Sequence, residues 1–88
     1  MKLEGVEVSE IDLEGVVVPV LNLGSAPQMD VQLRFRGEDF RYTSSVPVKG
    51  YGAILPGRVR EALEEGRRAL LVRRGERFYL YLTAAPEG

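Results

Sequence analysis

Apolar and polar residues alternate most strictly in the middle of the chain. One side of the alternation is apolar and consists of Met29, Val31, Leu33 and Phe35. A period of two residues is typical of a β-strand with one buried face. The pair Gly37-Glu38 follows, and it fits a two-residue turn with glycine in first position. The pattern therefore predicts a β-hairpin with strands over residues 29–36 and 39–46.

The register of this predicted hairpin brings arginines together on its polar face. It places Arg34 directly opposite Arg41, with Arg36 beside them. Directly opposed like charges destabilise a sheet, whereas an arginine-rich face is suited to bind phosphate or carboxylate through paired hydrogen bonds. The sequence leaves two interpretations of Arg34, Arg36 and Arg41 open. They form an anion-binding face, or they pair with acids that share one strand face, namely Glu10, Asp12 and Glu14.

Two strands are expected before the hairpin, over residues 2–8 and 11–21, because β-branched residues are frequent there. Pro19 has no N–H to donate, so it is expected at a sheet edge, a bulge or a strand end. The composition of residues 22–28 is typical of a flexible loop. Residues 84–88 are expected to form a frayed tail. Since 88 residues have room for one core, the chain is predicted to be a single domain over residues 1–88.

A short strand is expected at residues 53–55, and a helix after it over about residues 56–65. Pro56 suits the first helical turn, and Gly66 suits the left-handed position that ends a helix. The spacing of Val59, Ala62 and Leu63 predicts a narrow apolar stripe that packs on the sheet.

A last hairpin is expected over residues 68–73 and 77–83, with Arg73-Arg74-Gly75 as a type I turn followed by a glycine bulge. Its second strand is apolar on one side and carries Tyr79 and Tyr81 on the other, so it is expected to be central or covered. The predicted fold class is α+β and mainly antiparallel β. We expect a small closed or half-open β-barrel of six or seven short strands with one short α-helix.

Composition argues against the commonest kinds of catalysis. The chain contains no cysteine and no histidine, which removes thiolate nucleophiles, imidazole bases and the usual transition-metal ligands. Ser44, Ser45 and Lys49 suggest a serine–lysine arrangement, but no strand-turn-helix elbow surrounds them. We therefore predict no enzyme activity, no catalytic residues, no cofactor and no metal site.

The charge of the chain is close to neutral in total and uneven along its length. Residues 1–33 carry one lysine and six acids, a sum of −5, whereas residues 34–82 carry eleven basic groups and six acids, a sum of +5. Arginines near Tyr79 and Tyr81 are candidate nucleic-acid contacts, namely Arg58, Arg73, Arg74 and Arg77. A pI near 5.5 and the interleaved acids favour a solvated, ion-paired surface instead.

The stretch 51–82 resembles the swapped-hairpin domain of AbrB/SpoVT-type transition-state regulators. The resemblance rests on Ile54-Leu55-Pro56, Val59-Arg60-Glu61-Ala62-Leu63, Gly66 and a closing hairpin at Gly75. It implies a dimeric DNA-binding barrel, as in many antitoxins. In that family the DNA contacts precede the strand-Pro-helix unit, which here is the region of Arg34, Arg36 and Arg41.

The wider stretch 31–82 is similar to an uncharacterised bacterial small-barrel family that occurs joined to a bacteriocin-protection (YdeI-like) domain. The shared residues are Gly37, Phe40-Arg41, Ser44, Gly50-Tyr51, Leu55-Pro56, Arg60 and Gly66. This resemblance implies a small barrel and brings no known activity.

The function predicted from the sequence is a non-catalytic small β-barrel that binds a protein or an anionic ligand of unknown identity. The alternative is a homodimeric AbrB-like DNA-binding transcriptional regulator or antitoxin. The small size and the aromatic strand favour a homodimer. The sequence has no apolar run of membrane-spanning length and begins without a signal-peptide pattern, so a cytoplasmic location is expected. Arginine makes up ten of the twelve basic residues, a mix that suits a thermophilic or GC-rich source.

Overall fold

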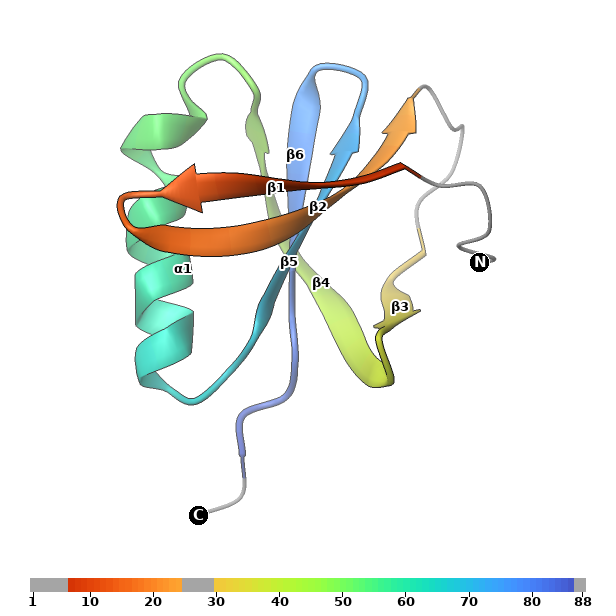
Figure 1. Ribbon diagram of the computed structural model, residues 1–88, viewed down its shortest axis with the longest axis vertical. Helices are drawn as coiled ribbons and strands as arrows, with labels where there is room; N and C mark the ends of the chain where they lie inside the picture. The colour runs from red at the N-terminus through yellow and green to blue at the C-terminus, as the bar shows by residue number, and fades with distance from the viewer. Residues whose placement is uncertain (1–6, 25–29, 87–88) are drawn as a thin grey trace.

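The computed structural model describes residues 7–24 and 30–86. Within them it shows a curled six-stranded sheet and one α-helix (Figure 1). In chain order the elements are β1 (Glu7–Leu13), β2 (Val16–Gly24), β3 (Gln32–Phe35), β4 (Glu38–Pro47), a short 3-10 turn η1 (Tyr51–Ala53), α1 (Leu55–Glu64), β5 (Ala69–Arg74) and β6 (Arg77–Leu82). The predicted α+β class, a half-open barrel with mostly antiparallel strands, is confirmed.

The strands lie side by side in the order β1-β2-β5-β6-β4-β3. β2 and β5 run parallel, and every other neighbouring pair is antiparallel. β6 lies between β5 and β4, so the strand with apolar or aromatic residues on both faces is central, as predicted. Figure 1 shows the β1–β2 hairpin lying across the strands β4, β5 and β6. Leu13, Val18 and Val20 of this hairpin belong to the apolar layer that also includes α1.

Each face of the sheet has its own apolar layer. The helix-side layer consists of buried residues from five strands and α1, namely Leu13, Val18, Val20, Val46, Leu55, Val59, Ala62, Ala69, Leu71, Phe78, Leu80 and Leu82. The concave-side layer consists of Leu21, Leu33, Phe35, Phe40, Leu70, Val72 and Tyr81. β5 contributes to both layers, because its alternate side chains point to opposite faces and both faces are covered.

Local signals set the ends of α1. Pro56 lies in its first turn, where a missing N–H breaks no helical hydrogen bond. At the other end Arg67 N donates to Ala62 O and Gly66 N donates to Leu63 O, and Gly66 has φ 79°. This is a Schellman ending, which requires the left-handed conformation that Gly66 adopts. The buried apolar stripe of α1 is narrower than the sequence predicted, because Val59 and Ala62 are buried but Leu63 is 41% exposed.

Two of the turns differ from their predictions by one or two residues. The β3–β4 turn is Arg36-Gly37, with φ angles of 51° and 81°. Two positive φ values indicate a type I′ turn, whose twist matches that of the strands although it prefers Asn, Asp or Gly in first position. The β5–β6 turn is Gly75-Glu76, because Arg74 pairs with Arg77, and the predicted type I turn with a bulge is wrong.

Several strand, helix and loop boundaries also differ from those predicted from the sequence. A turn at Glu14-Gly15 makes residues 7–24 one hairpin, so the predicted break between residues 8 and 11 is wrong. Residues 53–55 are not a strand, because η1 ends and α1 begins there. Of the predicted loop 22–28, residues 22–24 belong to β2 and the remainder lies outside the described residues. Residues 84–86 have no regular structure, and 2–6 and 87–88 lie outside the description.

Candidate functional site

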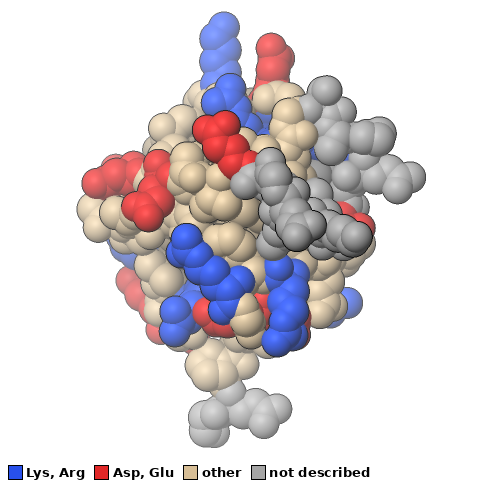
Figure 2. All heavy atoms as spheres, turned by 45° about the vertical axis from the view of Figure 1, so that its right-hand side comes forward, with Lys and Arg blue, Asp and Glu red and all other residues tan. Residues whose placement is uncertain are grey.

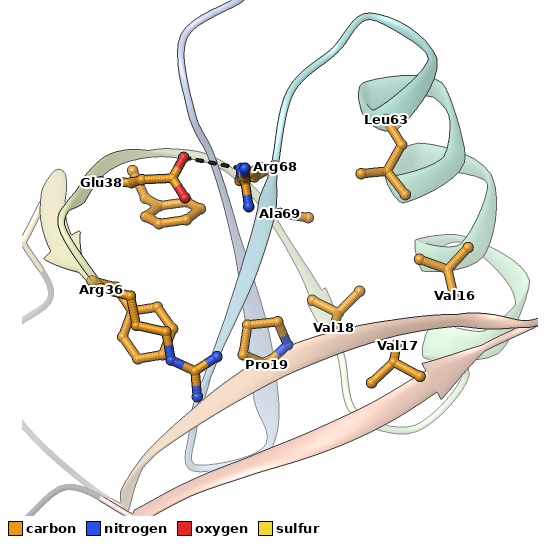
Figure 3. A pocket seen from close by; sticks show the side chains of 11 residues that line it. Val16, Val17, Val18, Pro19, Arg36, Glu38, Leu63, Arg68 and Ala69 are labelled. Atoms are coloured by element: carbon orange, nitrogen blue, oxygen red, sulfur yellow. Dashed lines mark ion pairs between the residues drawn. The ribbon is translucent and has the colours of Figure 1, made fainter.

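A hollow opens where β2 leaves the sheet. Within the described strands β2 pairs with β5 from Val20 to Gly24, while Val16 to Pro19 pair with β1 alone. The turn end of the β3–β4 hairpin lies on the other side of the gap (Figure 3). The hollow between them has a volume of about 240 Å³. We call it the seam, and its lining residues are Val16, Val17, Val18, Pro19, Phe35, Arg36, Glu38, Phe40, Leu63, Arg68 and Ala69.

The backbone of β2 explains why the seam stays open. Because Leu13 and Val16 flank a two-residue turn, Val16 and Val18 direct their hydrogen-bonding groups to β1. The backbone groups of Val17 and Pro19 therefore point to the seam. Pro19 lacks the N–H that a further strand would use, so it lies at an unpaired edge, one of the positions expected for it.

The lining of the seam is mainly apolar. Val17 of β2 is 57% exposed and Leu63 of α1 is 41% exposed, and both line this hollow. Phe35 and Phe40, which meet edge-to-face with ring centroids 6.4 Å apart, also line it and belong to the concave-side layer. Two large apolar side chains from separate elements, Val17 and Leu63, are thus partly open to water beside buried aromatic rings, which is a common property of ligand sites.

Arg36 places a positive charge at the rim of the seam. Its guanidinium carbon lies 4.7 Å from the ring centroid of Phe35, and Figure 3 shows the side chain reaching toward Pro19 of β2. No ion pair between described residues includes Arg36. Its backbone has φ 51°, a conformation that costs an L-residue about 1–2 kcal/mol relative to the right-handed region. Strain of this kind is often found at functional positions.

A second charged group at the rim is already neutralised. Arg68 Nε lies 3.2 Å from Glu38 Oε2, and this ion pair joins β4 to the residue that precedes β5 (Figure 3). The rim therefore presents one ion pair and the guanidinium of Arg36. Because its unpaired charge is positive and its walls are apolar, the seam is suited to an apolar group that carries an anion.

The sequence predicted that Arg34, Arg36 and Arg41 lie together on one strand face, and in the structure the three do not lie together. The predicted opposition of Arg34 and Arg41 is wrong, because the turn at Arg36-Gly37 places Arg34 opposite Asp39 instead. Arg34 Nη1 lies 3.3 Å from Asp39 Oδ1, so an opposite charge replaces the like charge. Arg41 lines a separate hollow of about 320 Å³ together with Arg67.

The acids proposed as partners of these arginines have other contacts. Glu14 Oε2 lies 3.6 Å from Arg60 Nη2, which joins the β1–β2 turn to α1. Asp12 Oδ1 accepts a hydrogen bond of 2.7 Å from Gly15 N inside that turn. Among the described residues no ion pair joins Glu10, Asp12 or Glu14 to Arg34, Arg36 or Arg41. The pairing interpretation is therefore wrong for these acids.

The four arginines considered for nucleic-acid contact lie on two faces. Arg58 of α1 donates to Ser44 Oγ at 2.7 Å, and Arg73 shares the helix side of the sheet with Phe78. Arg77 donates to Ser45 Oγ at 3.0 Å and lies on the concave side, as does Arg74. On the face shown in Figure 2 basic and acidic side chains are interspersed.

Three tyrosines meet on the concave side, an arrangement that the sequence did not indicate. The ring centroids of Tyr42 and Tyr81 are 5.8 Å apart, and those of Tyr42 and Tyr79 are 6.1 Å apart. The Tyr81 hydroxyl donates to the backbone carbonyl of Asp30. Burial, more than the nearby charge of Asp30, raises the pKa of Tyr81. The cluster depends on the β4–β6 pairing, in which Tyr42 is opposite Tyr81, and the sequence did not predict that pairing.

Comparison with family models, with curated proteins and with solved structures finds no match for this chain. No helix in the described part has the length and hydropathy needed to span a membrane. Within residues 7–24 and 30–86 no three acidic side chains converge on a point where a metal ion would bind.

Proposed function

We propose that the protein is a non-catalytic binding module and that the seam is its ligand site. The ligand has an apolar body and a carboxylate head, which pairs with Arg36. The observation that supports this is a guanidinium without an ion pair to the described residues, at the rim of a mainly apolar hollow. The seam lining contains no nucleophile next to a base, which is why binding is favoured over catalysis.

The volume of the seam limits the size of this ligand. At about 30 Å³ for each water molecule, its volume of about 240 Å³ holds roughly eight water-sized groups. A carboxylate with a chain of about eight carbons has this size. At a ligand efficiency of about 0.3 kcal/mol per heavy atom, ten atoms contribute about 3 kcal/mol. The expected Kd is therefore about 6 mM.

Titration with octanoate, followed by amide NMR, tests this proposal. We expect shifts at Val17, Leu63 and the Arg36-Gly37 turn, and binding about tenfold weaker for octanol, which has the same body without the charge. Arg36→Asn removes the charge and suits a type I′ turn, so this variant should fold and lose the preference for octanoate. Arg34→Gln is the matched control, because Arg34 pairs with Asp39 outside the seam.

Two results would contradict the proposal. One is the absence of shifts at the seam with about 60 mM octanoate, roughly tenfold above the expected Kd of about 6 mM. The other is equal weakening by Arg36→Asn and Arg34→Gln, because that would indicate a general effect of charge.

The homodimer and the cytoplasmic location stay predictions, as does the alternative of a DNA-binding regulator. Exposed Val8 and Val31 support the dimer, since both are large apolar side chains on or beside edge strands. Sedimentation equilibrium over a hundredfold concentration range tests it, and a constant monomer mass would refute it.

A further inference from the structure

The concave side carries a second polar and aromatic surface, which shares no lining residue with the seam. It is formed by Tyr42 of β4, by Tyr79, Tyr81 and Arg77 of β6, and by Arg74 of β5. We call it the tyrosine face. A hollow of about 310 Å³ lies on it, lined by Tyr42, Tyr79, Tyr81, Arg74, Val31 and Asp30.

The β4–β6 pairing sets the positions of the aromatic rings. Tyr42 is directly opposite Tyr81, and the register shifts after Tyr42, so Ser45 and not Ser44 is opposite Tyr79. Tyr81 is fully buried and serves as the floor of the cluster, whereas Tyr42 is 41% exposed. Tyr79 is half-buried beside it. Two rings are thus open, at least in part, to a planar group from solvent.

The two arginines of this face, Arg74 and Arg77, pair with each other across the strands and with no acid among the described residues. Arg74 and Arg77 are directly opposite each other at the end of the β5–β6 hairpin, an arrangement in which like charges repel. The Arg74 guanidinium carbon lies 5.6 Å from the ring centroid of Tyr79, and Arg77 donates to the neutral hydroxyl of Ser45. Neither forms an ion pair with a described residue. An anion between the two guanidiniums would relieve their repulsion.

We propose that the tyrosine face binds a nucleobase that carries a phosphate. The base stacks on Tyr42 and Tyr79, and the phosphate lies between Arg74 and Arg77. Stacking on aromatic side chains beside basic groups is the usual chemistry of single-strand recognition. A mononucleotide and a single-stranded oligonucleotide share this chemistry. The proposal is independent of the seam, because no residue of the tyrosine face lines it.

The position of Asp30 indicates which end of the tyrosine face the phosphate of the ligand occupies. Asp30 lines the hollow near Tyr81, whose hydroxyl bonds its carbonyl. Arg77 is four residues before Tyr81 on β6, which is about 13 Å along a strand. A phosphate is therefore favoured at the arginine end and disfavoured at the Asp30 end.

The charge distribution argues for single strands and against duplex DNA. Arg58 and Arg73 lie on the opposite side of the sheet, so about two phosphates are neutralised at this face. For single strands log Kd should then change with log salt with a slope of about 1.4, from about 0.7 for each phosphate. Bases inside a duplex are stacked on each other and do not reach the tyrosines.

The test is a titration of the protein with adenosine monophosphate, with an oligoadenylate of six nucleotides and with ribose 5-phosphate, followed by amide NMR and by fluorescence anisotropy. We expect shifts at Tyr42 and Tyr79 with the first two ligands, and at least fivefold weaker binding of ribose 5-phosphate, which lacks the base. Similar affinity for the two nucleotides indicates a mononucleotide site. At least tenfold tighter binding of the oligoadenylate indicates a single-strand site. Either result supports the proposal.

Three substitutions connect the binding to this face. Tyr42→Thr keeps a strand-forming residue and should weaken nucleotide binding at least fivefold. Arg77→Gln should weaken it and lower the salt slope by about 0.7. Arg58→Gln is the matched control, because Arg58 also donates to a serine of β4 but on the helix side, and it should leave binding unchanged.

Three results would overturn the proposal. The first is no binding of either nucleotide at 20 mM salt. The second is equal weakening by Arg77→Gln and Arg58→Gln, which would mean a general charge effect. The third is binding of ribose 5-phosphate as strong as that of the nucleotide, because the base would then contribute nothing.

Discussion

The hydroxyl of Tyr81 donates a hydrogen bond to the backbone carbonyl of Asp30, which ties the middle of the sheet to the chain two residues before β3. Tyr81 is fully buried, whereas Asp30 is exposed. This bond is thus made by a buried donor to a group near water. It positions both the chain entering β3 and the floor of the tyrosine face.

Tyr81→Phe is expected to lower the free energy of unfolding by about 1 kcal/mol, the usual net contribution of one hydrogen bond. The ring remains and keeps its packing, so the core is conserved. Urea unfolding followed by circular dichroism measures the change. A loss near 4 kcal/mol would contradict this account, because it would mean that the ring itself had moved.

Stability should fall at alkaline pH through the same residue. Burial raises the pKa of Tyr81 above its ordinary value of 10.0 in the folded state, so the unfolded chain loses this proton first. The contribution is complete below about pH 10 and declines as the pH rises toward the folded pKa, by at most about 1.4 kcal/mol per pH unit. Urea midpoints between pH 8 and 11 should fall less steeply in Tyr81→Phe, and identical slopes would refute the assignment.

Leu71 and Leu63 allow a matched test of what supports the fold. Leu71 is fully buried on β5, and Leu63 is 41% exposed at the seam. Leu71→Ala should cost about 2–5 kcal/mol, the range for a leucine removed from a core. Leu63→Ala should cost below about 1 kcal/mol and weaken octanoate binding. Equal losses of stability would mean that the seam is a part of the core.

Alanine substitutions at Gly66 and Gly75 distinguish the stability cost of backbone strain from that of a steric clash. Both have positive φ, 79° and 59°. A Cβ at Gly66 would lie 2.8 Å from Pro86 Cγ, whereas one at Gly75 would meet no atom within 4 Å. Gly75→Ala should therefore cost about 1 kcal/mol from the left-handed conformation alone, and Gly66→Ala should cost more. Thermal unfolding of both variants measures the difference, and a smaller effect at Gly66 would show that Pro86 moves away freely.

Local signals in the sequence predicted the parts of the fold that depend on a few neighbouring residues. Pro56 and Gly66 mark the ends of α1 because each satisfies a geometric requirement at that position. The two apolar faces of β6 predicted a central strand for the same kind of reason. The Arg36-Gly37 turn was missed because arginine is a poor residue for positive φ, and one displaced turn then changed every partner of Arg34 and Arg41.

The seam could not be predicted from the sequence because it depends on distant pairing. It exists where β2 separates from β5, and the parallel contact of Val20 with Leu71 has no signature in either strand alone. The tyrosine face depends likewise on the shift of register after Tyr42. Residue types predicted arginines and tyrosines as binding groups, but which of them meet is decided by topology.

The parallel ladder between β2 and β5 also has a consequence for synthesis on the ribosome. β2 finds its partner about fifty residues later in the chain, so at about 5–20 residues per second several seconds pass before the two strands can meet. During that interval Val20 and Leu21 lack the neighbouring strand with which they pair in the folded sheet. The nascent chain therefore exposes the apolar residues of β2 for several seconds before β5 can cover them.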